Sequence, residues 1–258
     1  MFTNNINPTI LSFNLITLHW YGLFLATGIL LSIWILLKLA QKNNLSKNII
    51  FDLSIWLIIG GLIGARLGYI IFYQLNYYLS NPIEIIFINH GGLSSHGLTL
   101  GLIISFLLFK KLKKENLDWK KLIDILIVPI PLLASFIRLG NFFNSEIVGR
   151  ATDLPWGVYF PRFENNPILR HPVQLYEFFI NLSLFFILYF LYKKYKNKKP
   201  SLFFFHLFLI LYFASRFLIE FTKEFQVDWE NFFTAGQWLS IPFILWGIIY
   251  FIKLKIKQ

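Results

Sequence analysis

The chain has 258 residues, of which 56% are hydrophobic and only 14% charged, and its mean hydropathy is +0.59. Soluble domains carry about 25% charged residues, so this composition excludes a soluble globular protein and a disordered one. The absence of cysteine excludes a disulfide scaffold, a protein thiol nucleophile and a thiolate metal site. A membrane span takes about 20 apolar residues, so the chain holds several spans and lacks room for the nucleotide-binding domain of an ATP-driven pump.

Seven continuous apolar runs predict an all-α polytopic membrane protein with seven transmembrane helices in a single integral membrane domain, 1–258. The runs cover about 17–37, 50–73, 92–109, 122–142, 173–192, 202–220 and 236–252. Pro129 and Pro131 predict a kink in the fourth run. Between spans, 74–90 is aromatic and lacks Lys and Arg, which predicts an arm along the membrane interface, and 143–172 predicts a small external head.

Lysines lie in alternate connecting segments, and this pattern predicts how the chain is oriented across the membrane. Segments 38–48, 110–121 and 193–200 and the C-terminal tail hold 17 of the 24 basic residues, whereas the opposite loops hold four. By the positive-inside rule the N-terminus lies outside and the C-terminus lies in the cytoplasm. We therefore attribute the net charge of +11 to membrane topology and predict no nucleic-acid partner.

Polar side chains of the spans gather in one layer near the predicted outer side. Tyr21, His96, Arg138 and Arg216 each lie about four residues, or roughly 6 Å, from the outer end of their span. The layer also includes Arg66, Glu177, Glu220 and Gln237. Buried charge in hydrocarbon costs several kcal/mol unless it is paired or hydrated, so the layer predicts a polar cavity that opens to the outer leaflet.

The residue types in this layer favour an anionic lipid as the ligand. Arginine matches phosphate oxygens bidentately, and a histidine near such a phosphate is a candidate general base or acid. The structural alternative is that each arginine only snorkels or pairs locally, as Arg216 and Glu220 would at positions i and i+4. The histidines share no metal-ligand spacing, so we predict no metal site.

Seven stretches of sequence are more specific than composition. They are HWYG (19–22), GARLGYIIFY (64–73), GGLSSHGLTLG (91–101), RLGNFFNSEIVGRATDLPWGVYFP (138–161), RHPVQLYE (170–177), YFASRFLIEF (212–221) and AGQWLSIP (235–242). In this order, from about Tyr21 to Gly247, the chain resembles the prolipoprotein diacylglyceryl transferases. The resemblance implies a seven-span enzyme of the bacterial cytoplasmic (inner) membrane, with its site toward the outer leaflet.

The resemblance also implies the reaction and its partners. The diacylglyceryl group of phosphatidylglycerol moves to the lipobox cysteine thiol of a prolipoprotein signal peptide, a thioether forms and glycerol phosphate leaves, with no metal or cofactor. His96 is then the candidate general base, and Arg138 and Arg216 hold the phosphate whose charge grows in the transition state. The implied substrate-binding residues are Tyr21, Gly97, Arg138, Asn141, Glu146, Gly149, Tyr212 and Glu220.

Several positions depart from the family's pattern. Leu98 stands where a second glycine usually follows the motif histidine, and Lys223 stands where an arginine is usual. Phe136 and Ile137 replace small residues before Arg138. These departures bear on the fit of the headgroup pocket, although His96 and the two arginines are in place.

Three other classes of protein are compatible with parts of this pattern. A transporter or flippase for an anionic lipid or solute would use the arginines, but it would carry polar groups on both sides of the midplane. A phosphatidyl transferase with metal-bound aspartates would need clustered intramembrane Asp, which the chain lacks. A non-catalytic membrane scaffold would leave the polar layer unexplained.

Overall fold

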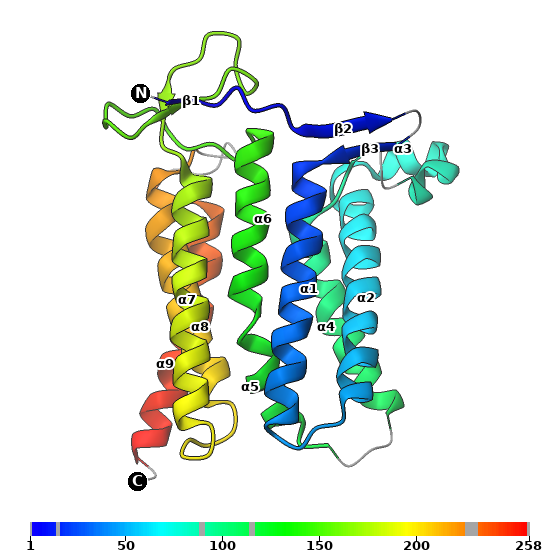
Figure 1. Cartoon of the computed structure of the whole chain (residues 1–258), viewed down its shortest axis with the longest axis vertical. Helices are drawn as coiled ribbons and strands as arrows, with labels where there is room; N and C mark the ends of the chain where they lie inside the picture. The colour runs from blue at the N-terminus through cyan, green and yellow to red at the C-terminus, as the bar shows by residue number, and fades with distance from the viewer. Residues whose placement is uncertain (1, 14–15, 88–90, 114–116, 225–231, 257–258) are drawn as a thin grey trace. The chain divides into compact units, whose positions relative to one another are not determined.

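The computed structural model describes residues 2–13, 16–87, 91–113, 117–224 and 232–256 (Figure 1). The chain divides into two compact units. The first unit consists of Met1–Leu36 and Lys120–Gln258, and the second unit consists of Leu37–Trp119. Each unit is described by itself below.

The described residues contain seven helical segments long and apolar enough to cross a membrane, which confirms the predicted fold class. The first unit holds most of α1, the span made by α5 and α6, α7, α8 (Phe203–Ile219) with the short η3 (Glu220–Thr222), and α9. The second unit holds α2 and α4. The spans are Trp20–Gln41 (α1), Lys47–Tyr73 (α2), Ser95–Leu112 (α4), Trp119–Asn144, Val173–Tyr195 (α7), Phe203–Thr222 and Ala235–Ile256 (α9). The predicted ends lie within about one helical turn of these.

The fourth span is broken where the prolines predict a kink. Helix α5 (Trp119–Ile127) ends before Pro129, and α6 (Ile130–Asn144) begins after it. A proline has no amide hydrogen and its ring clashes with the preceding turn, so the helix cannot continue unchanged. At its other end α6 terminates at Ser145, whose φ of 58° is left-handed and turns the chain out of the helix.

In the second unit, glycines let α2 and α4 approach closely. A Cβ on Gly64 would lie 2.5 Å from the carbonyl oxygen of Gly97 and 2.6 Å from the Cα of Gly101. A Cβ on Gly68 would lie 2.5 Å from the Cα of Gly97. Gly60, Gly64 and Gly68 repeat every four residues, the spacing of a close helix–helix contact in membranes. The packing role of Gly97 and Gly101 follows from this contact.

Arg66 ties the segment between α2 and α4 to α2. Arg66 is only 4% exposed, and its guanidinium donates hydrogen bonds to backbone carbonyl oxygens. The acceptors are Glu84, Ile85, Phe87, Gly91 and Gly92, at 2.5–3.2 Å. Arg66 therefore satisfies its buried charge with carbonyl dipoles of its own unit rather than with a carboxylate.

The predicted arm contains two short helices, α3 (Leu75–Ser80) and η1 (Pro82–Ile86). Its large apolar side chains point to the outside: Leu79 and Ile86 are each 71% exposed, and Ile83 is 69% exposed. Exposed apolar groups on a short helical segment suit the membrane interface, so the interfacial placement of 74–90 stays a prediction with a physical basis. Residues 88–90 of this segment lie outside the described residues.

The head of the first unit is a small sheet that includes the N-terminus. Strand β1 (Phe2–Thr3) pairs in parallel with β4 (Val158–Tyr159), which pairs antiparallel with β5 (Leu169–Arg170). A second ribbon pairs β2 (Thr9–Phe13) with β3 (Ile16–His19). Figure 1 shows β1 and the C-terminal end of α9 at opposite ends of the first unit. The N-terminus and the 143–172 segment thus share one end of the unit.

Ion pairs hold the head to the chain that follows α8. Arg170, whose side chain is 10% exposed, donates to both carboxylate oxygens of Glu164 at 2.8 and 2.9 Å and to Glu224 at 2.6 Å. The hydrogen bonds from Arg170 lower the pKa of Glu164 below its ordinary value. The next residue after Arg170, His171, has its pKa lowered by burial.

We expect Gly64→Ala to destabilise the second unit. The new Cβ would meet backbone atoms of α4 that have no flexible end to move aside, and overpacking of this kind costs about 1–3 kcal/mol. The measurement is the thermal midpoint of the purified protein in detergent. Gly22→Ala on α1 is the control, because a Cβ there meets nothing within 4 Å; equal midpoints for both variants would contradict the packing role.

We expect Glu164→Gln to lower stability near neutral pH by up to about 1 kcal/mol and to have no effect in acid. The pKa of Glu164 is depressed in the folded state, so its stabilising charge is present above the unfolded value and is lost as pH falls through the folded value. Thermal midpoints of both proteins, measured from about pH 7 to pH 3, should converge at the acid end. A constant difference across that range would exclude the ion pair as the cause.

Candidate functional site

Charged side chains from α6, α7 and the end of α8 meet in the first unit. Here the ionic network means Arg138, Glu177, Arg216, Glu220 and Lys223. Arg138 Nε lies 2.7 Å from Glu177 Oε2, and Lys223 Nζ lies 2.9 Å from both Glu177 Oε1 and Glu220 Oε1. Arg216 Nη2 is 3.9 Å from Glu220 Oε1. Lys223 therefore joins the two arginine–glutamate pairs into one group.

Burial differs between the anions and the cations of this network. The side chains of Glu177 and Glu220 are each 8% exposed and that of Lys223 is 5% exposed, whereas Arg138 is 19% and Arg216 is 31% exposed. Three cations face two carboxylates, so the network has a formal charge of +1. The surplus charge lies on the two arginines that reach the surface, and a monoanion bound there would neutralise it.

Glu177 is held by ion pairs more than by hydrogen bonds. Its Oε2 atom is buried and lies 2.7 Å from Arg138 Nε, yet the N–H direction does not point at it, and Oε2 accepts no hydrogen bond from the described part of the chain. A buried carboxylate oxygen of this kind is costly unless charge compensates it. The compensation comes from Arg138 and Lys223 together.

Asn141 links Arg138 to the loop after α6. Arg138 Nη1 donates to Asn141 Oδ1 at 3.3 Å, and Asn141 Nδ2 donates to Glu146 Oε2 at 2.9 Å. Gln174 Nε2 on α7 donates to the Glu146 carbonyl at 2.7 Å. The residues predicted from the 138–161 motif to act together are therefore joined in one hydrogen-bonded chain. Glu146 is exposed, so solvent screens its charge from the network.

Other predicted site residues take defined positions in the first unit. Tyr21 is half-buried on α1 and packs on Gly140, where a Cβ would lie 2.8 Å from the tyrosine ring. Tyr212 is half-buried on α8 and stacks on Phe208 with ring centroids 5.1 Å apart. Gly149 is buried, forms a bridge with Lys223, and donates its amide to the His171 carbonyl at 3.0 Å.

The start of α9 completes the surroundings of Glu220. Thr234 Oγ1 donates to Glu220 Oε2 at 3.2 Å, and a Cβ on Gly236 would lie 2.5 Å from the Glu220 carboxyl carbon. Sequence reasoning singled out the 235–242 motif but assigned no role to Thr234 or Gly236. It treated Lys223 only as a departure from a pattern, although this residue is the centre of the network.

His96 and Gly97 belong to the second unit. His96 is exposed in the first turn of α4, and Ser94 caps that helix by accepting the Gly97 amide at 3.3 Å. Gly97 is buried against α2. Their predicted roles as general base and substrate contact stay predictions. Among the described residues, no group of three or more His, Cys, Asp or Glu side chains is placed to hold a metal ion.

The chain is similar to known proteins over almost its whole length. The family model described as prolipoprotein diacylglyceryl transferase matches residues 8–253. A phosphatidylglycerol–prolipoprotein diacylglyceryl transferase of Tolumonas auensis is 41% identical over 95% of this chain and 94% of its own length. Proteins of the same name from Bacteroides fragilis and Chloroherpeton thalassium are 40% and 37% identical, over 95% and 98% of this chain and 93% and 94% of their own.

We expect Lys223→Met to destabilise the first unit by about 3–5 kcal/mol, because it leaves two buried carboxylates without their shared cation. Lys223→Arg, which keeps the charge, should retain most of the stability. Thermal midpoints in detergent measure both, and Lys198→Met in an exposed loop controls for the loss of a lysine. A Lys223→Met protein as stable as the control would show that the ion pairs contribute little.

Proposed function

Because this chain belongs to the prolipoprotein diacylglyceryl transferase family, we propose that it moves the diacylglyceryl group of phosphatidylglycerol to the lipobox cysteine thiol of a prolipoprotein signal peptide. It is a multi-pass membrane protein. We place it in the bacterial cytoplasmic (inner) membrane with the ionic network toward the outer leaflet. The distribution of its lysines supports this orientation.

The reaction exchanges one bond to carbon for another. The thiol sulfur attacks the diacylglyceryl carbon that is bonded to the phosphate oxygen, a carbon–sulfur bond forms, and the carbon–oxygen bond breaks. The bonding electron pair leaves with the oxygen, so a phosphodiester with one negative charge becomes a phosphate monoester with more. The thiol proton passes to a base. The nucleophile is the substrate's, so the enzyme needs no cysteine of its own.

The observation that carries this proposal is the uneven exposure of the ionic network. The two partly exposed arginines stand over two buried carboxylates, and the surplus positive charge suits a phosphodiester. Arg138 turns its Nε edge to Glu177, and among the described residues its Nη2 group has no protein partner. The Nη2 group is thus available to a phosphate whose charge grows as the carbon–oxygen bond breaks, and stabilisation of developing charge accelerates such a step.

The remaining predicted residues have roles that fit this chemistry. Arg216 is held near Glu220 and contacts the phosphate or the departing glycerol phosphate. Tyr21 and Tyr212 hydrogen-bond the headgroup, and Gly149 lets the head loop cross closely beside His171 and Val173. His96 takes the thiol proton, because a thiolate is the better nucleophile and histidine exchanges protons near neutral pH. The head of the first unit admits the signal peptide.

The test is transfer by the purified protein from phosphatidylglycerol to a synthetic lipobox peptide, followed by mass spectrometry of the peptide. We expect a diacylglyceryl adduct on the cysteine peptide and none on a peptide with serine in its place. Arg138→Ala should slow transfer by about 100-fold or more, and Arg138→Lys should retain an intermediate rate because it keeps charge without the planar fork. A folded protein that forms no adduct would instead favour transport of an anionic lipid.

The role of His96 has a separate test. His96→Gln should lower the transfer rate at neutral pH, and raising the pH toward the ordinary thiol pKa of about 8.5 should restore part of it, since the thiolate then forms without a base. The measurement is the ratio of variant to wild-type rates across pH. A ratio that does not change with pH would assign His96 to binding or packing.

A further inference from the structure

Gln174, in the 170–177 motif, is a fully buried polar residue that has no role in the reaction described above. It lies in the first turn of α7, three residues before Glu177. Its Nε2 donates to the Glu146 carbonyl at 2.7 Å, and its Oε1 accepts no hydrogen bond from the described part of the chain. A buried amide with an unsatisfied oxygen lowers stability, so an apolar side chain would serve packing better. The donation to Glu146 is the contact that accounts for a glutamine here.

The acceptor of this hydrogen bond lies in a strained loop. The residues on either side of Glu146, Ser145 and Ile147, have φ values of 58° and 55°, in the left-handed region. For a β-branched residue such as Ile147 this conformation is an outlier. The Ile147 side chain is exposed, so packing of that side chain does not hold it there. Strained residues persist where the surrounding structure over-determines them, and Gln174 supplies such a contact at the carbonyl between Glu146 and Ile147.

Glu146 carries the effect of this contact to Arg138. Asn141 Nδ2 donates to Glu146 Oε2 at 2.9 Å, and Arg138 Nη1 donates to Asn141 Oδ1 at 3.3 Å. The Glu146 amide also donates to the Asn141 carbonyl at 3.0 Å. Both the backbone and the side chain of Glu146 therefore bind Asn141, and a shift of the loop moves the amide that accepts from Arg138.

Helix α7 thus orients two edges of the Arg138 guanidinium. Glu177 lies 2.7 Å from Nε, and Gln174, one turn earlier on the same helix, acts on Nη1 through Glu146 and Asn141. The guanidinium is a planar, rigid fork, so holding two of its edges also fixes the direction of Nη2, the group that is available to a phosphate.

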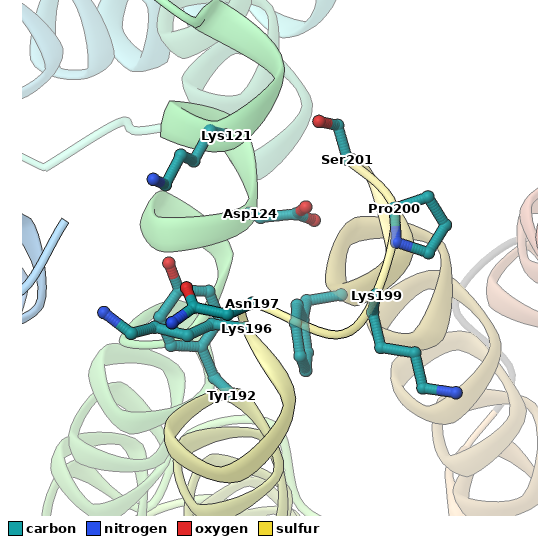
Figure 2. Close-up of a pocket in the computed structure, with 9 residues that line it drawn as sticks. Lys121, Asp124, Tyr192, Lys196, Asn197, Lys199, Pro200 and Ser201 are labelled. Carbon is teal, nitrogen blue, oxygen red and sulfur yellow. The ribbon is translucent and has the colours of Figure 1, made fainter.

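The far end of α7 is packed as well, so the helix is a fixed frame for these contacts. Figure 2 shows Tyr192 of α7 beside a polar cavity that Lys121, Asp124 and Lys196 also line. Tyr192 is buried, and its ring meets that of Phe204 on α8 with centroids 4.8 Å apart. A group held by a packed helix is placed more precisely than one held by a loop alone.

We propose that Gln174 is a positioning residue for Arg138. Its hydrogen bond to the Glu146 carbonyl fixes the loop after α6, and this loop fixes the direction of the guanidinium through Asn141. The inference rests on the proposed function, in which Arg138 stabilises the charge that develops on the phosphate. Gln174 itself does not touch the substrate. Without its hydrogen bond the loop moves, and a misplacement of about 1 Å at a reacting centre costs about 100-fold in rate.

The test compares Gln174→Met, which keeps the size of the side chain and removes the donor, with Asn181→Leu. Asn181 is a second buried amide on α7 and donates within the helix to the Glu177 carbonyl at 2.8 Å. The thermal midpoints of the two variants should match. We expect Gln174→Met to lower kcat for transfer about 10- to 100-fold with an unchanged KM for the lipobox peptide, and Asn181→Leu to change neither quantity.

A double-mutant cycle measures whether the effect passes through Arg138. A lysine at position 138 has no Nη1 group for Asn141, so in an Arg138→Lys background Gln174 has no guanidinium to orient. We expect Gln174→Met to lower kcat in that background by less than about twofold, because the two substitutions act on one interaction. An equal fold loss in both backgrounds means general damage to the fold and would overturn the proposal, as would a Gln174→Met protein as fast as the wild type.

Failure of the proposed function gives a different result. A wild-type protein that forms no adduct contradicts the transfer reaction, and the cycle is then read on the rise in thermal midpoint that phosphatidylglycerol gives over phosphatidylcholine in mixed micelles. A smaller rise for Gln174→Met than for Asn181→Leu, with no such difference when Arg138→Lys is also present, supports the positioning role. Equal rises for the two single variants contradict it.

A second variant covers the case in which Gln174→Met does not fold. Gln174→Asn keeps an amide but is one methylene shorter, so it no longer reaches the Glu146 carbonyl. It should show the same fall in kcat and the same dependence on Arg138, and a Gln174→Asn protein with full activity would overturn the proposal.

Discussion

Two carboxylates, Glu177 and Glu220, are buried, and one lysine forms an ion pair with both. Lys223 lies 2.9 Å from each, so α7 and the end of α8 cannot separate without exposing or leaving unpaired a buried charge. Such a loss costs several kcal/mol in a protein interior. The same two carboxylates also hold the arginines, because Arg138 pairs with Glu177 and Arg216 pairs with Glu220.

The network also leaves surplus positive charge on its two arginines. If each arginine paired with a carboxylate that no other cation shared, each pair would be neutral and would gain little from binding a phosphate. Because Lys223 takes a share of both carboxylates, the arginines keep surplus charge at the surface while the anions stay inside. A positioned cation that is not fully neutralised is what stabilisation of a developing phosphate charge requires. The balance depends on Lys223 as much as on either arginine.

Hydropathy and lysine placement were sufficient to predict the seven spans and the kink at Pro129, since both depend on local composition and on a missing amide hydrogen. They were not sufficient for Arg66, whose five acceptors are backbone carbonyls 18 to 26 residues away and leave no pattern in residue type. Strand β1 was missed for the same reason, because two residues pair with a distant strand. The motifs grouped Arg138, Asn141 and Glu146, and hydrogen bonds join these three side chains because they lie within two turns and a cap; their role in binding stays a prediction. Lys223 joined that group only through tertiary packing.

The two ends of the first unit present positive charge in different ways, and the difference has a physical meaning. At one end the cations are planar guanidiniums held by buried carboxylates, so they are fixed in direction. At the other end the cations are flexible ammonium groups around a cavity whose walls are fixed by Asp124 and Tyr250. A lysine ammonium is a point charge on a flexible stem and has no planar fork to align. The two ends of the first unit therefore differ in how firmly the protein fixes the direction of its cations.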